Sequence, residues 1–80
     1  MTNLEKYKLA FIKAFELDNH FSDFVNLEYQ SIAEWDSVGH MGLVAELEEL
    51  FSVMLEMDDI VDLSSFTKGI EILEKNGVSF

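Results

Sequence analysis

The pattern of apolar and polar positions predicts helices and no strands. The segment Thr2-Asn3-Leu4-Glu5 fits a helical capping box and opens a run with apolar residues at helical spacing. This run predicts a helix over residues 3–17, which Asp18-Asn19 is expected to end. Its inward-facing residues are expected to be Leu4, Tyr7, Phe11, Ala14 and Phe15.

The strongest helical pattern covers residues 37–51. Asp36 and Ser37 stand at its start, and the side chain of either residue predicts an N-cap. A second apolar arc on this helix is edged by carboxylates, and it predicts either a docking surface or packing under the preceding loop. The expected core stripe is Leu43, Leu47, Leu50, Phe51 and Met54, with Val44 at its margin; the second arc is Val38, Met41 and Ala45, flanked by Glu48 and Glu49.

The remaining segments predict a long loop and two further helices. Residues 18–35 are too apolar to remain exposed to solvent as a loose loop. We therefore expect a loop that packs across the helices, with a short helical turn near residues 22–26. Residues 58–62 predict one short helix, and Ser64-Ser65 predicts the cap of a final helix of about ten residues that Asn76-Gly77 ends. That final helix is expected to point Phe66, Ile70, Leu73 and Ile72 inward. The sequence therefore predicts an all-α fold, a small four-helix bundle with a long loop between its first two helices, formed by a single domain over residues 1–80.

The charge distribution restricts the partners. The net charge is −11, and the five basic residues are all lysines. Residues 19–67 contain eleven acids and no lysine or arginine, so this part should attract basic partners, although such a surface also serves solubility alone. Nucleic acid and anionic membranes are not expected as partners. No segment is long enough to insert into a membrane, and the N-terminus lacks a secretory pattern, so a cytoplasmic location is expected.

Catalytic and metal-binding constellations are hard to assemble from this sequence. Ser37 and His40 are spaced to share a helix face, but no glycine elbow precedes the serine. His40 is instead expected to be a partly buried residue satisfied by local backbone or loop groups. Asp58, Asp59 and Asp62 lack the calcium-loop pattern, and the chain has no cysteine, so neither an enzyme nor an intrinsic metal site is expected.

The sequence resembles the acyl carrier proteins. Asp36-Ser37-Val38 is similar to the Asp-Ser-Leu attachment motif of that family, and the likeness continues through Leu47-Glu48-Glu49-Leu50-Phe51 to the capped final helix, over nearly all of residues 1–77. The longer string, residues 35–41, looks like the variant found in specialised free-standing carriers. Gly42 departs from the family, many members of which carry an acid there.

The resemblance implies a specific function. Ser37 would carry 4′-phosphopantetheine, transferred from coenzyme A by a phosphopantetheinyl transferase, and Asp36 would help hold magnesium in that complex. The protein would be a monomeric carrier of acyl or aminoacyl thioesters in fatty acid or secondary metabolite biosynthesis, and no enzyme itself. Its partners would be a loading ligase and an acyltransferase or synthase with a basic docking surface. The docking residues implied are Val38, Met41, Ala45, Glu48 and Glu49, with Asp59 and Asp62 as weaker candidates.

Two other functions fit the same residues. An acidic helical adaptor would dock basic partners without any prosthetic group. A small hydrolase would use Ser37 and His40 as nucleophile and base.

Overall fold

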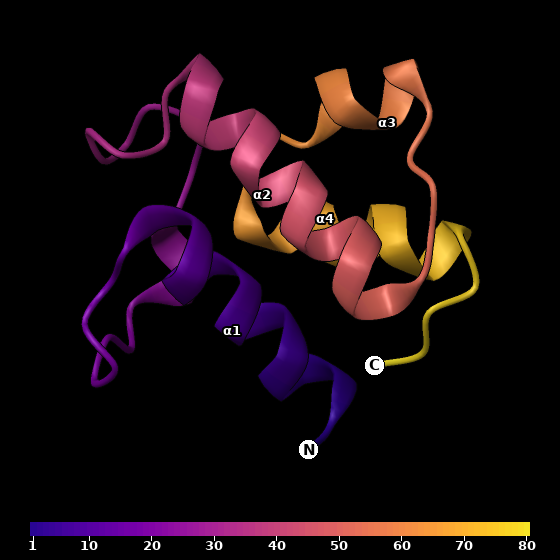
Figure 1. Ribbon diagram of the computed structural model, residues 1–80, viewed down its shortest axis with the longest axis horizontal. Helices are drawn as coiled ribbons and strands as arrows, with labels where there is room; N and C mark the ends of the chain where they lie inside the picture. Colours follow the sequence, from indigo (N-terminus) through magenta and orange to yellow (C-terminus); the bar gives the residue numbers. More distant parts are fainter.

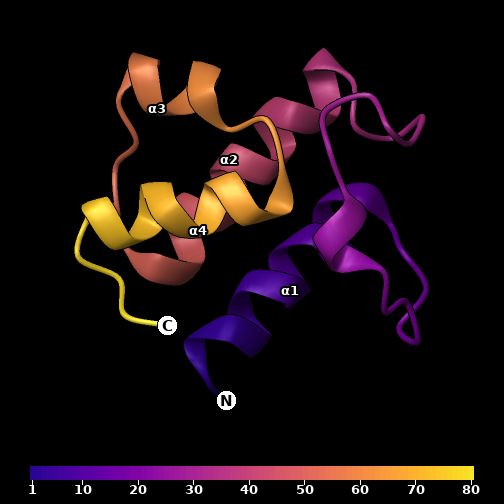
Figure 2. The same cartoon turned by 180° about the vertical axis from the view of Figure 1, so that it is seen from behind.

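The computed structural model describes residues 1–80 and contains four α-helices and no strand. The helices are α1 (Asn3–Phe15), α2 (Ser37–Phe51), α3 (Met57–Asp62) and α4 (Phe66–Lys75), and one 3₁₀ turn, η1 (Phe24–Asn26), interrupts the long loop. In Figure 1, α2 crosses the centre of the molecule above α1, and α4 lies behind α2; Figure 2 shows the same layers from the other side. The predicted all-α bundle with one short helix is confirmed.

α1 begins as predicted but ends earlier. The Thr2 hydroxyl accepts from the Glu5 backbone N–H at 3.1 Å, and the Glu5 carboxylate accepts from the Thr2 N–H at 2.9 Å, which completes the capping box. The helix stops at Phe15 because Glu16 adopts the left-handed conformation, at a φ of 53°. The predicted end at Asp18-Asn19 was therefore wrong. Leu4 was also assigned inward but is 39% exposed.

The predicted bounds of α2 are confirmed, but its core stripe is shorter than predicted. Leu43, Val44 and Leu47 are buried in the main cluster of apolar side chains, and Leu50 and Phe51 pack at its edge. Met54 was predicted to extend this stripe and is 84% exposed. The helical period no longer applies there, because Ser52 adopts the left-handed conformation and ends the helix.

The long loop is pinned across the bundle as expected. Its 3₁₀ turn falls at Phe24–Asn26, and Phe24 and Leu27 are buried. Further along, the Leu27 carbonyl accepts from the Phe66 N–H at 3.0 Å, and the Tyr29 N–H donates to the Ser64 carbonyl at 2.8 Å. These backbone bonds join the loop to the start of α4 and leave the segment before α2 little freedom.

α4 has the predicted length, and its ends are capped as expected. The Ser65 hydroxyl accepts from the Lys68 N–H at 3.0 Å, and Gly77 follows the helix at a φ of 94°. Of the residues predicted to face inward, Phe66, Ile72 and Leu73 are buried, whereas Ile70 is half-buried.

Candidate functional site

The N-terminus of α2 presents a serine hydroxyl to solvent. Asp36 is the N-cap, and its Oδ1 accepts from the Gly39 N–H at 2.8 Å. Ser37 is the first residue of the helix and is exposed, and its hydroxyl makes no hydrogen bond within the protein. The free N–H groups of a helix's first turn and the helix dipole favour an anionic group at this end.

A close backbone approach fixes the chain leading into this helix. A Cβ on Gly39 would lie 2.0 Å from the carbonyl oxygen of Glu34, so only glycine fits there. The first turn of α2 therefore packs directly on the end of the loop. Together with the Asp36 cap, this contact holds Ser37 in a fixed place at the surface.

Trp35 anchors the same segment in the core. Its side chain is fully buried, and its ring meets those of Phe11 and Phe15 at centroid distances of 5.6 and 5.2 Å. Its indole Nε1–H donates to His40 Nδ1 at 2.9 Å. The tryptophan two residues before the serine thus ties the loop to both α1 and α2.

His40 connects α2 to α3. An indole N–H can only donate, so His40 Nδ1 must accept; Nε2 then carries the proton and donates to the Ile60 carbonyl at 2.7 Å. The ring is half-buried, and one of its partners, Trp35, belongs to the loop before α2. Both observations agree with the prediction of a partly buried histidine satisfied by backbone or loop groups. The second partner, twenty residues further along the chain, was not predicted.

A pocket of about 350 Å³ opens beside the serine. It lies between the N-terminal part of α2, α3 and the loop, and most of its wall is apolar. Its volume is at the small end of the range of about 300–1,000 Å³ usual for ligand sites. The residues around it are Tyr29, Ser37, His40, Met41, Ile60, Val61, Leu63 and Ser64.

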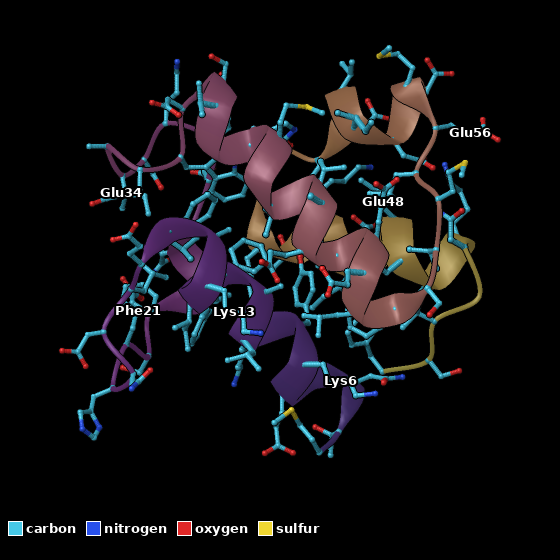
Figure 3. All side chains as sticks on the ribbon, viewed as in Figure 1. Lys6, Lys13, Phe21, Glu34, Glu48 and Glu56 are labelled. Atoms are coloured by element: carbon cyan, nitrogen blue, oxygen red, sulfur yellow. The ribbon has the colours of Figure 1, made fainter.

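On the other side of the serine the surface is acidic. A second hollow there is lined by Glu16, Glu34 and Asp36, together with Val38 and Gly39. No three acidic or imidazole side chains in the protein converge in a way that could hold a metal ion. Figure 3 shows Glu34 and Glu56 pointing outward at opposite ends of the upper half, and Lys6 and Lys13 on α1 below.

The second apolar arc of α2 is open to solvent. Val38 is 80% exposed and Met41 is 53% exposed, and Ala45 is also exposed. Packing under the loop, one of the two interpretations of this arc, is therefore wrong. Val61 of α3, 73% exposed, lines the same pocket as Met41 and carries exposed apolar surface onto the short helix.

The predicted acidic docking residues differ in their environments. Glu49 and Asp62 are exposed. Glu48 is half-buried, and its carboxylate accepts from the Leu55 N–H at 2.9 Å, where it holds the link between α2 and α3. This second contact leaves Glu48 only partly available to a partner.

Asp59 is not available for docking, contrary to the expectation from the resemblance. It is 3% exposed, and its carboxylate pairs with the Lys75 ammonium and accepts from the Asn76 amide at 3.3 Å. The hydrogen bond from Lys75 lowers the pKa of Asp59 below its ordinary value and raises the pKa of Lys75. Helical spacing could not reveal this burial, because the partner lies at the end of α4.

No helix combines the length and the apolar character that a bilayer crossing requires. No protein-family model, curated protein or solved structure matches the chain.

Proposed function

We propose that this protein is an acyl carrier protein that holds a 4′-phosphopantetheine group on Ser37. The observation that carries the proposal is the exposed Ser37 hydroxyl, free of internal hydrogen bonds, at the capped N-terminus of α2. The likeness of Asp36-Ser37-Val38 to the carrier attachment motif adds to it. When bound, the group supplies a terminal thiol that carries an acyl or aminoacyl chain as a thioester.

The residues around Ser37 fit such a group. Attachment needs an accessible hydroxyl, and Ser37 is exposed on a helix start where a phosphodiester is electrostatically favoured. The adjoining pocket offers a mostly apolar wall to whatever is tethered there. In the attachment step the Ser37 oxygen would form a bond to the phosphorus next to the pantetheine, the phosphorus–oxygen bond to the nucleotide phosphate of coenzyme A would break, and the hydroxyl proton would pass to a base of the transferase.

Asp36 has one oxygen left for a second task. Its Oδ1 caps the helix through Gly39, and no hydrogen bond in the protein uses Oδ2. We propose that Oδ2 helps hold magnesium when the transferase is bound. The cap and the metal contact would then be separable by substitution.

Partner enzymes are proposed to bind the exposed face next to the serine. Val38, Met41 and Ala45 would supply apolar contact, while Glu49 and Asp62 would attract basic residues, with a smaller part for Glu48. A loading ligase and an acyltransferase or synthase are the partner classes that such a carrier requires.

The geometry disfavours the hydrolase alternative. A base that activates Ser37 needs a free nitrogen, and both ring nitrogens of His40 are engaged by Trp35 and by the Ile60 carbonyl. The adaptor alternative uses the same exposed face, so the presence of the prosthetic group is what separates it from a carrier.

The test is modification by a broad-specificity phosphopantetheinyl transferase with coenzyme A and magnesium. Intact-mass measurement should show a gain of about 340 Da, the mass of the covalent group. Ser37→Ala should abolish this gain, whereas Ser22→Ala, at an exposed loop serine, should not. An unmodified wild type, or a Ser37→Ala variant that still gains the mass, would refute the carrier function; the unmodified protein purified from its own host would favour the adaptor.

A second pair of variants tests Asp36. Asparagine caps helices about as well as aspartate, so Asp36→Asn should keep the unfolding temperature but slow the modification. Asp36→Ala should lower the unfolding temperature, because the missing cap costs about 1 kcal/mol of stability, and it should also slow the modification. Equal modification rates for wild type and Asp36→Asn would contradict the magnesium role.

A further inference from the structure

The pocket beside Ser37 is bounded by a side chain that also holds α3 in place. His40 lines the pocket, and its Nε2–H donates to the Ile60 carbonyl at 2.7 Å. The carbonyls in the last turn of a helix lack partners within that helix, and His40 supplies one to α3. This bond therefore bridges α2 and α3 at the edge of the pocket.

α3 has few other attachments. Met57 and Val61 are 74% and 73% exposed, and Ile60 is only half-buried. Its second polar anchor is Asp59, which pairs with Lys75 at the end of α4. A six-residue helix with so little buried apolar surface is the element most easily displaced, so the bond from His40 matters for where it sits.

The His40 ring is itself held from behind. Its Nδ1 accepts from the indole of Trp35, and the two rings stack with a centroid distance of 6.2 Å and an interplanar angle of 17°. Trp35 is fully buried, so the imidazole cannot swing away without losing a partner on each side. Leu63, which also lines the pocket, is buried at 1% exposure and belongs to the main cluster of apolar side chains.

We propose that His40 is a specificity-determining latch, which restricts the group tethered at Ser37 to short acyl or aminoacyl chains. This inference rests on the proposed carrier function and concerns its cargo. A short chain fits the surface pocket with α3 in place. A long chain finds no further room until the bond from His40 to Ile60 is broken.

The experiment compares unfolding temperatures across a series of attached chains. Ser37 is loaded with acetyl, butyryl, hexanoyl, octanoyl and dodecanoyl groups from the corresponding coenzyme A thioesters, and loading is verified by mass. In the wild type, the unfolding temperature should rise along the short chains and level off by hexanoyl. In His40→Ala it should keep rising, with dodecanoyl above hexanoyl by roughly 4 °C or more, which burial of only one or two of the additional methylenes would already produce.

The comparison is made within each variant, so a general loss of stability does not affect it. His40→Gln, which keeps a donor and an acceptor, should restore the levelling, and His20→Ala, at an exposed loop histidine, should behave as the wild type. If the wild type continues to gain stability with octanoyl and dodecanoyl as His40→Ala does, the latch is refuted. The latch is also refuted if neither the wild type nor His40→Ala gains stability with chains longer than hexanoyl.

A chemical version separates this inference from the carrier function. The chain has no cysteine, so Ser37→Cys provides a single thiol for a series of alkyl methanethiosulfonates. In Ser37→Cys with His40 present, the unfolding temperature should again level off as the alkyl chain lengthens. In Ser37→Cys with His40→Ala it should continue to rise. Failure of the transferase to modify Ser37 would refute the proposed function, while this series would still decide the latch.

Discussion

Two helical glycines allow one substitution to be tested in opposite environments. Replacement of glycine by alanine inside an exposed helix adds about 1 kcal/mol of stability from helix propensity. A Cβ on Gly42 of α2 would meet nothing within 4 Å. Gly42→Ala should therefore stabilise the protein by about 1 kcal/mol and raise its unfolding temperature by roughly 4–8 °C.

Gly69 of α4 should respond with the opposite sign. A Cβ there would lie 2.0 Å from the Tyr7 hydroxyl oxygen and 2.9 Å from Leu63 Cδ1. The Tyr7 hydroxyl donates to the Phe66 carbonyl at 2.6 Å, and burial raises the pKa of Tyr7 so that it stays a donor. Gly69→Ala loses that bond, about 1 kcal/mol, and overpacks the core by about 1–3 kcal/mol. After the propensity gain of about 1 kcal/mol, the net loss should be about 1–3 kcal/mol.

Urea and thermal unfolding followed by circular dichroism measure both effects. A double variant identifies the cause: Tyr7→Phe removes the hydroxyl, so Gly69→Ala should cost less in that background than in the wild type. The same combination with Gly42→Ala should be additive, because Gly42 has no contact with Tyr7. Equal stability changes at the two glycines, or additivity of Gly69→Ala with Tyr7→Phe, would refute this account of the α1–α4 contact.

Four further predictions concern the capping and anchoring residues. Asp59→Asn should be less stable than the wild type at neutral pH. The lowered pKa of Asp59 makes its contribution complete above the ordinary value of 3.8, so the difference should shrink as the pH falls through the lower folded-state pKa, which urea midpoints would measure. The partner behaves conversely, and the stabilisation from Lys75 should fade only as the pH rises above 10.5 through its raised pKa. Gly39→Ala should displace the Glu34 backbone at a cost of about 1–3 kcal/mol and shift the emission of the single tryptophan toward longer wavelength; an unchanged spectrum and midpoint would contradict the close approach. Ser65→Ala should lose about 1 kcal/mol in thermal unfolding through the missing cap, and no loss would mean that the cap is replaced.

The features that sequence reasoning predicted are those with local causes. The Thr2 capping box, the Asp36 cap and the Ser65 cap each depend on side chains within three residues, and all three form as their motifs indicate. The helical period placed Leu43 and Leu47 in the core for the same reason. A single left-handed residue ends each of the first two helices, Glu16 after α1 and Ser52 after α2. No composition signal marked the stop at Glu16, so α1 was predicted two residues too long. The end of α2 was predicted correctly, but its apolar stripe was extended past Ser52 to Met54.

The features that it missed depend on contacts between distant segments. Asp59 reads as one more surface acid of an acidic helix, and only the fold brings Lys75 and Asn76 to it. Trp35 and Ile60 likewise gain their roles through His40, which lies five residues from one and twenty from the other. The available signal for the bond between Trp35 and His40 was a tryptophan five residues before a histidine. A buried indole N–H requires an acceptor, and the histidine ring lies within reach of it.

The local contacts and the contacts between distant segments would serve a carrier in different ways. The Asp36 cap and the close approach at Gly39 hold Ser37 at one exposed place, where the proposed transferase would meet the hydroxyl without reordering the chain. The neighbouring wall is built differently, because α3 is held mainly by His40 and Asp59 and buries little apolar surface of its own. With Ser37 fixed and α3 easily displaced, a tethered cargo could move between a position packed against α3 and a position exposed to a partner enzyme, while its attachment point stays in place. If that difference holds, substitutions at Gly39 should impair modification, whereas substitutions at His40 should alter which cargo is sheltered and leave modification unchanged.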